Sequence, residues 1–569
     1  MRYLTLVADY DGTLAEHDRI PEQTAEALRR LRISGRRAIM VTGRRLADLL
    51  RVCSCPELFD LIVAENGGVL YSPSARRTTI VTQPPPKALL QALRARRVEP
   101  LEIGDVIVAT LESQRSAVQE TLWQLGLEHQ LIANRGSVMV LPPGVNKASG
   151  LALALRKLGL SRHEAVGIGD AENDHSFLQC CECAAAVANA VPSLKANVDF
   201  VTAGEGPQGV RELIDELIAD DLVRLQDVLE RDRILLGYGE DDRPVWVTPY
   251  GCNILVAGAS ASGKSTLTAG VVERLLEMDY QVCIVDPEGD YGTLEQVVAL
   301  GNQLRAPSVS EILGILEDPK VNLSLNLLGV PLGDRSEFLA QLMPNLHALR
   351  ARTGRPHWLV LDEAHHMAPP TWGPIERELP RQLGEVLVVT VQPEHISPTL
   401  LATVDIVVAT GPDPERTLGE FARATKRDLA WPEYLAYQPG KVVVWFARAG
   451  QAPFPMTPQP GRAERIRHLR KYAEGDLRWH SFYFRGPHGK TNLKAHNLAI
   501  FSHLAQGIDE ETWMFHLLRG DYSRWFRDAI RDAHLADEAS RLERRDDLAP
   551  WQTRELIREL ISSRYTLPE

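Results

Sequence analysis

The chain opens with an apolar run, residues 4–8, that ends in two aspartates one residue apart, Asp9 and Asp11. The run predicts a buried strand, and carboxylates at the end of a buried strand are costly unless they meet a cation or a reacting group. In an open α/β sheet, ligands bind at that edge. The alternative is an acidic turn, because Asp and Gly are ordinary turn residues. Residues later in the chain that could act together with Asp9 and Asp11 decide between a ligand-binding site and an acidic turn.

The same arrangement recurs through the first third of the chain. A helix with Pro at its start and Gly past its end is predicted over residues 21–35. Strand, helix and strand at this spacing predict a doubly wound parallel α/β sheet. Between residues 82 and 143, short β-like runs around one helix predict a small inserted α/β unit. The further apolar runs are residues 37–41 before Thr42, 61–64 before Glu65 and 165–168 before Gly169 and Asp170.

These motifs resemble, in their order, the four motifs of haloacid dehalogenase-superfamily phosphatases. The resemblance covers residues 1–216 and implies a Rossmann-like domain with a small α/β cap, about 82–143, between the second and third motifs. The short cap is more similar to archaeal phosphoglycolate phosphatases than to larger sugar phosphatases such as sucrose-phosphate phosphatase. The residues that carry the resemblance are Asp9, Asp11 and Thr13, Thr42 and Arg44, Lys147, and Asp170, Asn173 and Asp174.

Phosphoryl transfer needs these residue types for chemical reasons. A carboxylate can attack phosphorus and form an aspartyl-phosphate, which water then hydrolyses, and Asp9 is the expected nucleophile. Asp11, two residues on, can protonate the leaving oxygen and later activate water. Thr42 and Lys147 are expected to bind the phosphoryl oxygens, whose charge needs fixed donors and cations. Lys147 also keeps Asp9 ionised beside other carboxylates.

The resemblance implies a Mg²⁺ ion in this site, held by Asp9, the backbone carbonyl of Asp11 and Asp170, with Asp174 in support. Mg²⁺ prefers oxygen ligands, which these residues supply. Taken alone, Thr42 is equally explained as a strand cap and Asp174 as an acid at a helix N-terminus. The cluster Cys180, Cys181 and Cys183 lacks the spacing of paired metal ligands and is read as buried thiols.

A second phosphate-binding pattern starts near residue 253. A predicted strand over residues 253–257 leads into a complete Gly-x-x-x-x-Gly-Lys-Ser loop, followed by a predicted helix. Backbone N–H groups of such a loop face phosphates, the lysine contacts the β- and γ-phosphates and the serine holds Mg²⁺. The expected ATP-binding residues are Gly258, Ala259, Ser260, Ala261, Ser262, Gly263, Lys264, Ser265 and Thr266.

Two later strand ends complete the expected site. Asp362 is placed as a Mg²⁺ carboxylate, Glu363 as the base that polarises water and Gln392 as a γ-phosphate sensor. Residues 234–449 resemble the HerA/FtsK-type ATPases, which implies a RecA-like P-loop α/β domain and assembly as a homo-oligomeric ring. The arginine finger is not assigned. Candidates, each equally explained as a surface arginine, are Arg352, Arg355 and Arg416.

The remaining segments connect or follow these domains. Residues 217–233 are a predicted helical connector, and residues 450–475 a Pro-rich and basic linker that includes a basic helix over 462–471. Residues 476–569 are predicted to be a helical domain whose aromatics, at helical spacing, form its core. This domain has no recognisable function in its sequence.

Charge and cysteine content narrow the function classes. A formal net charge of -12 gives no sign of a global nucleic-acid-binding surface. Seven cysteines, odd in number and mostly in apolar stretches, favour a reducing cytoplasm, and no apolar run approaches a membrane span. The expectation is a cytoplasmic Mg²⁺-dependent phosphatase for a small phosphorylated metabolite, fused to an ATP-binding and ATP-hydrolysing domain. The alternative is an ATP-driven nucleic-acid translocase or end-processing protein with an accessory phosphatase domain.

Overall fold

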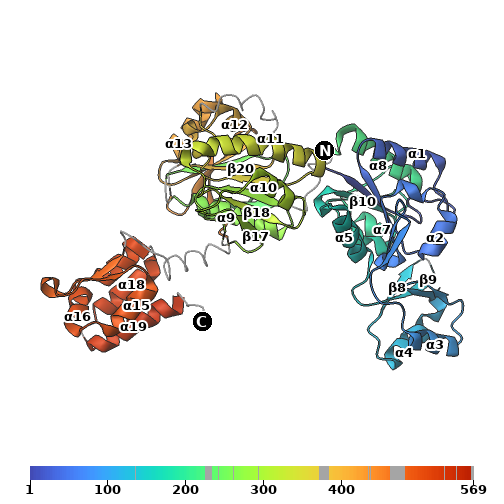
Figure 1. Ribbon diagram of the computed structural model, residues 1–569, viewed down its shortest axis with the longest axis horizontal. Coiled ribbons are helices and arrows are strands. Elements are labelled where there is room, and N and C mark those ends of the chain that lie inside the picture. The colour runs from blue at the N-terminus through green and yellow to red at the C-terminus, as the bar shows by residue number, and fades with distance from the viewer. Residues whose placement is uncertain are drawn as a thin grey trace.

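The computed structural model has three bodies, which follow one another along the chain from blue to red in Figure 1. It describes residues 1–134, 136–223, 233–240, 242–259, 262–292, 294–370, 384–432, 435, 438–461, 481–530, 532–545 and 547–564. Within this described part, no helix is both long enough and apolar enough to cross a membrane.

The N-terminal domain is built on an eight-stranded sheet in the order β12-β11-β10-β1-β2-β3-β4-β5. The strands from β12 to β3 are parallel, as predicted, and β4 and β5 extend the edge antiparallel. The central strands are buried on both faces, which explains their continuous apolar runs. The strands are β1 (Thr5–Asp9), β2 (Arg37–Val41), β3 (Leu61–Ala64), β4 (Val69–Ser72), β5 (Arg77–Ile80), β10 (Ala165–Gly169), β11 (Cys183–Ala186) and β12 (Phe200–Val201).

Helices cover this sheet and bury their apolar faces against it. The helix predicted over residues 21–35 is α1 (Glu22–Ile33), which starts directly after Pro21 and lies beside α8 (Gly206–Asp220) in Figure 1. Helix α8 extends into the segment predicted as a connector, whose residues 224–232 lie outside the described part. The other helices of the domain are α2 (Leu46–Val52), α5 (Lys147–Leu158), α6 (His175–Leu178) and α7 (Pro192–Lys195).

The inserted unit forms a small cap with its own core. Its antiparallel sheet has the order β6-β7-β9-β8, and apolar side chains of its two helices pack with those of the sheet. The predicted cap of about 82–143 corresponds to this unit. Its elements are α3 (Lys87–Ala95), β6 (Glu102–Ile103), β7 (Val108–Leu111), α4 (Arg115–Gln124), β8 (Gln130–Asn134) and β9 (Ser137–Leu141).

The middle domain is an eleven-stranded sheet in the order β14-β13-β23-β22-β21-β15-β20-β19-β16-β18-β17. The strands from β21 to β17 are parallel, and β22, β23, β13 and β14 continue antiparallel. The strands are β13 (Ile234–Tyr238), β14 (Pro244–Val247), β15 (Ile254–Gly258), β16 (Val282–Asp286), β17 (Val297–Leu300), β18 (Asn322–Asn326), β19 (Trp358–Leu361), β20 (Val386–Thr390), β21 (Ile406–Thr410), β22 (Val442–Phe446) and β23 (Phe454–Pro458).

Two apolar cores lie on the two faces of this sheet. Helix α9 contributes to one core, and the other helices contribute to the second. The helices are α9 (Lys264–Glu277), α10 (Val309–Leu316), α11 (Arg335–Thr353), α12 (Pro398–Ala402) and α13 (Pro414–Thr425). This is the α/β architecture expected for residues 234–449.

The proline-rich segment predicted as a linker differs from the expectation. Residues 454–458 form β23, which pairs with both β22 and β13 inside the sheet. Proline is a poor guide here, because it removes a ladder N–H but fits strand positions where that N–H has no partner to reach. The predicted basic helix over residues 462–471 lies outside the described residues.

The C-terminal domain is helical, with one short hairpin that the sequence did not predict. Its core is aromatic, as expected: Trp513, Tyr522 and Phe526 are fully buried among Phe484 and Phe501. The elements are β24 (Phe482–Phe484), β25 (Leu493–Ala495), α15 (Leu498–Gly507), α16 (Glu510–Leu518), α17 (Asp521–Trp525), a π-helical turn (Phe526–Ile530), α18 (Ala533–Glu543) and α19 (Pro550–Arg564).

A buried polar joint connects the N-terminal and middle domains. Arg355 donates to Glu164 over 2.9 Å, and each side chain is only 1% exposed. Arg355 also donates to the carbonyl of Gly159. The prediction that Arg355 is a surface arginine or an arginine finger is therefore wrong, because its guanidinium is buried in the joint and hydrogen-bonded to Glu164 and Gly159.

Aromatic rings and further charges surround this ion pair. The His163 ring stacks on Tyr280 with centroids 3.8 Å apart, and its two nitrogens face Glu182 and the carbonyl of Met278. Burial raises the pKa of Glu182, but hydrogen bonds and charge from His163 and Arg2 outweigh it and lower the pKa to about 2. The joint is thus made of paired charges packed between rings.

Every joint residue precedes a strand. Glu164 lies before β10, Arg2 before β1, Glu182 before β11, Tyr280 before β16 and Arg355 before β19. The amino edges of the two parallel sheets therefore face each other, and their carboxyl edges lie at the far ends of both domains.

We expect Arg355→Ala to destabilise the chain by about 3–5 kcal/mol, because it leaves the Glu164 carboxylate buried without its partner. Arg352→Ala is the matched control: Arg352 is 66% exposed and pairs with an exposed Glu317, so its loss should cost under about 1 kcal/mol. Thermal unfolding of the full chain measures both. Equal melting temperatures for the two variants would contradict the structural role of the joint.

Candidate active site

The sheet order of the N-terminal domain brings the first predicted residues together. Strand β1 lies between β10 and β2, and Asp9 is in register with Val41. The carboxyl ends of these three strands carry Asp9, Asp170 and Thr42 at one edge. All three side chains are buried, so their polar groups need partners inside the protein.

Lys147 reaches this edge from the start of α5. Gly67 and Gly150 allow the approach: a Cβ on Gly67 would lie 2.0 Å from the carbonyl oxygen of Asn146, and Gly67 has φ +102°. Lys147 Nζ donates to Asp9 Oδ1 and to Asp174 Oδ1, both over 2.6 Å. The lysine thus connects the predicted nucleophile to the last predicted motif.

The loop after β10 is fixed by Asp174. Its Oδ2 accepts from the backbone N–H groups of Asp170 and Ala171, and Gly169 lacks a Cβ that would lie 2.7 Å from the same oxygen. Asp170 Oδ1 accepts from the Thr13 hydroxyl. Asp174 therefore supports the loop that presents Asp170 beside Asp9.

Burial controls the ionisation of these groups. Burial and the charge of Asp174 raise the pKa of Asp9, against the lowering effect of Lys147. Burial lowers the pKa of Lys147, but the charges of Asp174 and Asp9 outweigh it and the net shift is upward. A site with this surplus of negative charge favours an added cation.

The donor set fits a hard divalent cation. Asp9, Asp170 and Asp174 each have a carboxylate oxygen within 4.8 Å of the others, with no sulfur or imidazole in the group. Oxygen-only sites of this kind suit Mg²⁺. Asp174 already accepts bonds on both oxygens, so Asp9 and Asp170 are the better placed to ligate.

Asp11 has a partner that the sequence analysis did not identify. The Arg44 guanidinium donates to both oxygens of Asp11, with Nε at 2.8 Å from Oδ2, and also pairs with Asp18. Arg44 follows Thr42 in the second motif, and the backbone N–H of Arg44 donates to the Thr42 hydroxyl. The position of Arg44, two residues after Thr42, was the sequence signal from which its contact with Asp11 could have been predicted.

A pocket of about 490 Å³ lies between this edge and the cap. Asp9 and Asp11 line its base, Arg45 and Arg51 come from the start and end of α2, and the cap contributes apolar and polar side chains. Thr42, Lys147, Asp170 and Asp174 do not line it and lie buried behind its wall. The other lining residues are Gly43, Arg44, Asp48, Glu102, Ile107, Ala109, Ser137, Met139, Ala171 and Asn173.

The second predicted site lies at the carboxyl edge of the middle sheet. Strand β15 ends at Gly258, where a Cβ would lie 2.1 Å from the carbonyl oxygen of Thr410. Lys264 Nζ donates to the carbonyls of Gly258 and Ala259. Ser265 and Thr266 follow in the first turn of α9, and Ser262 bonds to Thr410. Ser260 and Ala261 lie outside the described residues.

Acidic residues from the neighbouring strands face this lysine. Burial lowers the pKa of Lys264, and Glu363, Asp362 and Glu288 act against that shift. Burial and the charge of Glu363 raise the pKa of Asp362 to about 7. Gln392 follows β20, which lies between β15 and β19. Two of the arginine-finger candidates are paired: Arg352 with Glu317 and Arg416 with Asp413.

Glu65 is a further residue that motif reasoning passed over. Its carboxylate accepts from the backbone N–H groups of Asp105, Val106 and Ile107, which lead into β7 of the cap. Glu65 is 1% exposed and has φ +53°. The side chain at the end of β3 therefore connects the main domain to the segment that leads into β7 of the cap.

Comparison with known proteins concerns this first domain. Residues 6–96 and 106–214 match the haloacid dehalogenase-like hydrolase family. A phosphoglycolate phosphatase of Methanothermobacter thermautotrophicus is 27% identical over 212 residues, 37% of this chain and 96% of that protein. Phosphoglycolate phosphatase 2 of Saccharolobus solfataricus is 24% identical over 241 residues, 40% of this chain and 97% of that protein. A solved haloacid dehalogenase-like hydrolase from Bacteroides thetaiotaomicron is 20% identical, with TM-score 0.34, and the match covers 38% of this chain and 99% of that one.

We expect Glu65→Ala to release the cap connection, because three backbone N–H groups lose a charged acceptor worth about 1.5–3 kcal/mol per bond. Hydrogen exchange at the amides of residues 105–107 should accelerate at least tenfold. Glu120→Ala is the matched control, since Glu120 is a cap glutamate with 60% exposure. Unchanged exchange in Glu65→Ala would show that other contacts hold the connection.

Proposed function

We propose, on the premise that the N-terminal domain is a haloacid dehalogenase-superfamily phosphatase, that Asp9 hydrolyses a small phosphate monoester through an aspartyl-phosphate. The observation that carries this proposal is the buried arrangement in which Lys147 bridges Asp9 and Asp174 beside Asp170. The premise rests on the family match over residues 6–214.

In the first step, Asp9 Oδ2 attacks phosphorus and the bond to the ester oxygen breaks. Asp11, which lines the pocket, protonates the departing alkoxide and itself becomes a carboxylate. In the second step Asp11 takes a proton from water, which attacks phosphorus, so that phosphate departs and Asp9 is restored. Lys147 and Thr42, which are buried behind the pocket wall, are proposed to bind the phosphoryl oxygens from that side, and a Mg²⁺ ion bound by Asp9 and Asp170 would neutralise the charge of these oxygens.

Arg44 sets a condition on this cycle. Its guanidinium holds both oxygens of Asp11, and a carboxylate held in that way is a poor proton donor. We propose that the entering phosphate competes for Arg44 and frees Asp11 for its role as acid. The 25% exposure of Arg44, at the rim of the pocket, makes this exchange of partners possible.

We propose 2-phosphoglycolate as the first substrate to examine. The pocket is small, and Arg45 and Arg51 add positive charge beyond the phosphoryl site, which suits a second anionic group on a short substrate. The two relatives described above carry the name phosphoglycolate phosphatase. Arg45 already pairs with Asp48 and Glu102, and Arg51 pairs with Asp48, so a substrate carboxylate would have to replace those partners.

For residues 234–449 we propose ATP binding and hydrolysis that regulates or is coupled to the phosphatase. Support comes from the loop between β15 and α9, with Lys264 at its end and Asp362 and Glu363 at the end of β19. In this proposal Ser265 and Asp362 hold Mg²⁺ and Glu363 polarises the attacking water. The polar joint between the domains supplies a physical route for coupling.

We expect Asp9→Asn to lower the hydrolysis of p-nitrophenyl phosphate and 2-phosphoglycolate by on the order of a thousandfold or more, because the amide cannot act as the nucleophile. ATP hydrolysis should be unchanged. Asp215→Asn, at an exposed position on α8, is the control. Wild-type activity should disappear with EDTA and return with Mg²⁺. Phosphatase activity retained in Asp9→Asn would refute the assignment.

We expect Lys264→Ala to abolish ATP hydrolysis, because the loop loses the cation that contacts the β- and γ-phosphates. Lys320→Ala, an exposed lysine of the same domain, is the control. The phosphatase rate is measured with and without ATP in both variants. An ATP effect that survives Lys264→Ala would contradict coupling through this loop, and DNA added to the same ATPase assay examines the alternative function.

A further inference from the structure

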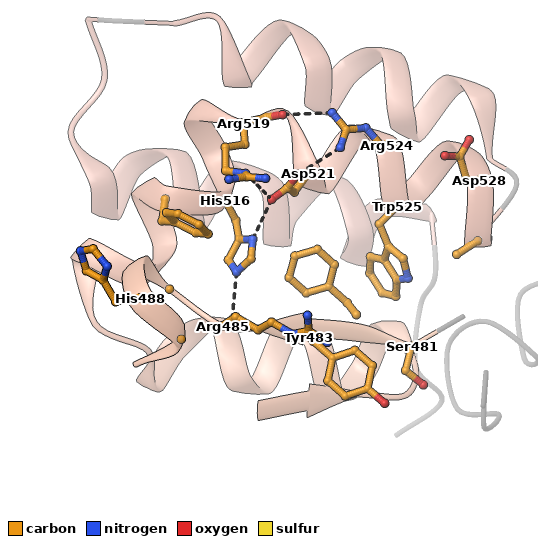
Figure 2. Close-up of a pocket in the computed structure, with 15 residues that line it drawn as sticks. Ser481, Tyr483, Arg485, His488, His516, Arg519, Asp521, Arg524, Trp525 and Asp528 are labelled. Atoms are coloured by element: carbon orange, nitrogen blue, oxygen red, sulfur yellow. Dashed lines mark hydrogen bonds and ion pairs between the residues drawn. The ribbon is translucent and has the colours of Figure 1, made fainter. Parts of the chain in front are cut away.

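The C-terminal domain contains a cavity of about 610 Å³ that neither proposed activity uses. Its walls come from β24 and the loop after it, from the end of α16, from α17 and from the π-helical turn (Figure 2). The size lies within the range of small-molecule sites. A π-helical turn is rare and occurs frequently at functional sites. Its presence in this wall supports a functional role for the cavity.

A chain of hydrogen bonds organises one end of the cavity. The backbone N–H of Arg485 donates to His516 Nε2 over 3.0 Å, and His516 Nδ1 lies 2.9 Å from Asp521 Oδ2. Because His516 Nε2 accepts a hydrogen bond, the ring proton lies on Nδ1, which donates a hydrogen bond to Asp521. The strand wall and the helical wall are therefore joined by polar groups, as the dashed lines in Figure 2 show.

Asp521 then positions two arginines. Arg524 Nη1 lies 3.3 Å from Oδ1 of Asp521, and Arg519 Nε lies 3.5 Å from Oδ2. Each guanidinium has five N–H donors, and these two are 65% and 61% exposed. Asp521 thus orients both arginines while leaving donors available to a ligand.

The charge of the cavity differs from that of the whole chain. Three arginines line it, Arg485, Arg519 and Arg524, against two carboxylates, Asp521 and Asp528. The balance is positive in a protein of net charge -12. Planar guanidinium forks match the oxygens of phosphate esters, so this end of the cavity suits a phosphate group.

The other end offers different chemistry. Asp528 lies on the π-helical turn, near Trp525 in Figure 2, and Ser481 lies at the start of the strand wall. Phe482 and Trp525, with ring centroids 5.3 Å apart, form an aromatic floor. A carboxylate that accepts hydroxyl protons beside an aromatic ring suits a polyhydroxylated carbon skeleton.

We propose that this cavity binds a sugar or polyol phosphate, with the phosphate on Arg519 and Arg524 and the hydroxyl groups toward Asp528. The arginines gather in one cavity of the domain rather than along an extended basic stripe, which disfavours a nucleic-acid strand. The two carboxylates are separated along the cavity and Asp521 is engaged by arginines, which disfavours a metal ion.

Isothermal titration calorimetry of the full chain tests the proposal with three probes: glucose 6-phosphate, ribose 5-phosphate and glycerol 3-phosphate. Every protein carries Asp9→Asn, so that the phosphatase domain does not consume the probe. We expect at least one probe to bind, and the double variant R519A/R524A to weaken its Kd at least tenfold. Both positions are exposed, so equal thermal unfolding curves should show that folding is retained.

The matched control is R541A/R544A, which removes the same charge from exposed positions outside the cavity and should leave Kd unchanged. Glucose without phosphate should not bind, and inorganic phosphate should compete weakly. Absence of binding for all three probes, an equal Kd in R519A/R524A, or equal binding of gluconate would overturn the proposal. None of these readouts depends on whether Asp9 is a nucleophile.

Discussion

The ion pairs of Lys147 with Asp9 and Asp174 are the interaction on which the N-terminal domain depends. Three charges are removed from water at the end of the sheet, and two ion pairs of 2.6 Å, together with the backbone N–H groups that donate to Asp174, compensate for that desolvation. The lysine reaches this position because Gly67 and Gly150 let α5 approach the end of β3. The connection to the cap starts from the same place, at Glu65, so the buried ion pairs and the cap connection both depend on the end of β3.

The sequence was a good guide to which polar residues meet at the strand ends. Asp9, Thr42 and Asp170 follow apolar runs, and parallel strands must bring their carboxyl ends together, so their meeting could be predicted. Side-chain contacts between different segments of the fold could not be predicted in this way. Arg44 stood within a predicted motif, but only the turn geometry shows that it holds Asp11. The roles predicted for these residues remain predictions until variants are measured.

The polar joint shows a different limit. Glu164 and Arg355 are 191 residues apart and belong to separate domains, and neither lies in a motif. Local pattern cannot reveal a partner at that separation, because the pairing depends on how two finished sheets meet. For the same reason Arg355 stood among the arginine-finger candidates, with a surface arginine as the alternative. In the C-terminal domain the aromatic spacing predicted a core correctly, while the cavity beside it forms where β24, the end of α16 and α17 meet and had no sequence signature.

The meeting of the two sheets at their amino edges has a consequence for the two predicted sites. Each parallel sheet carries the predicted phosphate-binding residues at the opposite edge, Asp9 in one domain and Lys264 in the other. The ion pair of Glu164 and Arg355 therefore lies on the side of each sheet away from both predicted sites. A substitution in this joint changes the contact between the domains without removing a side chain of either predicted site.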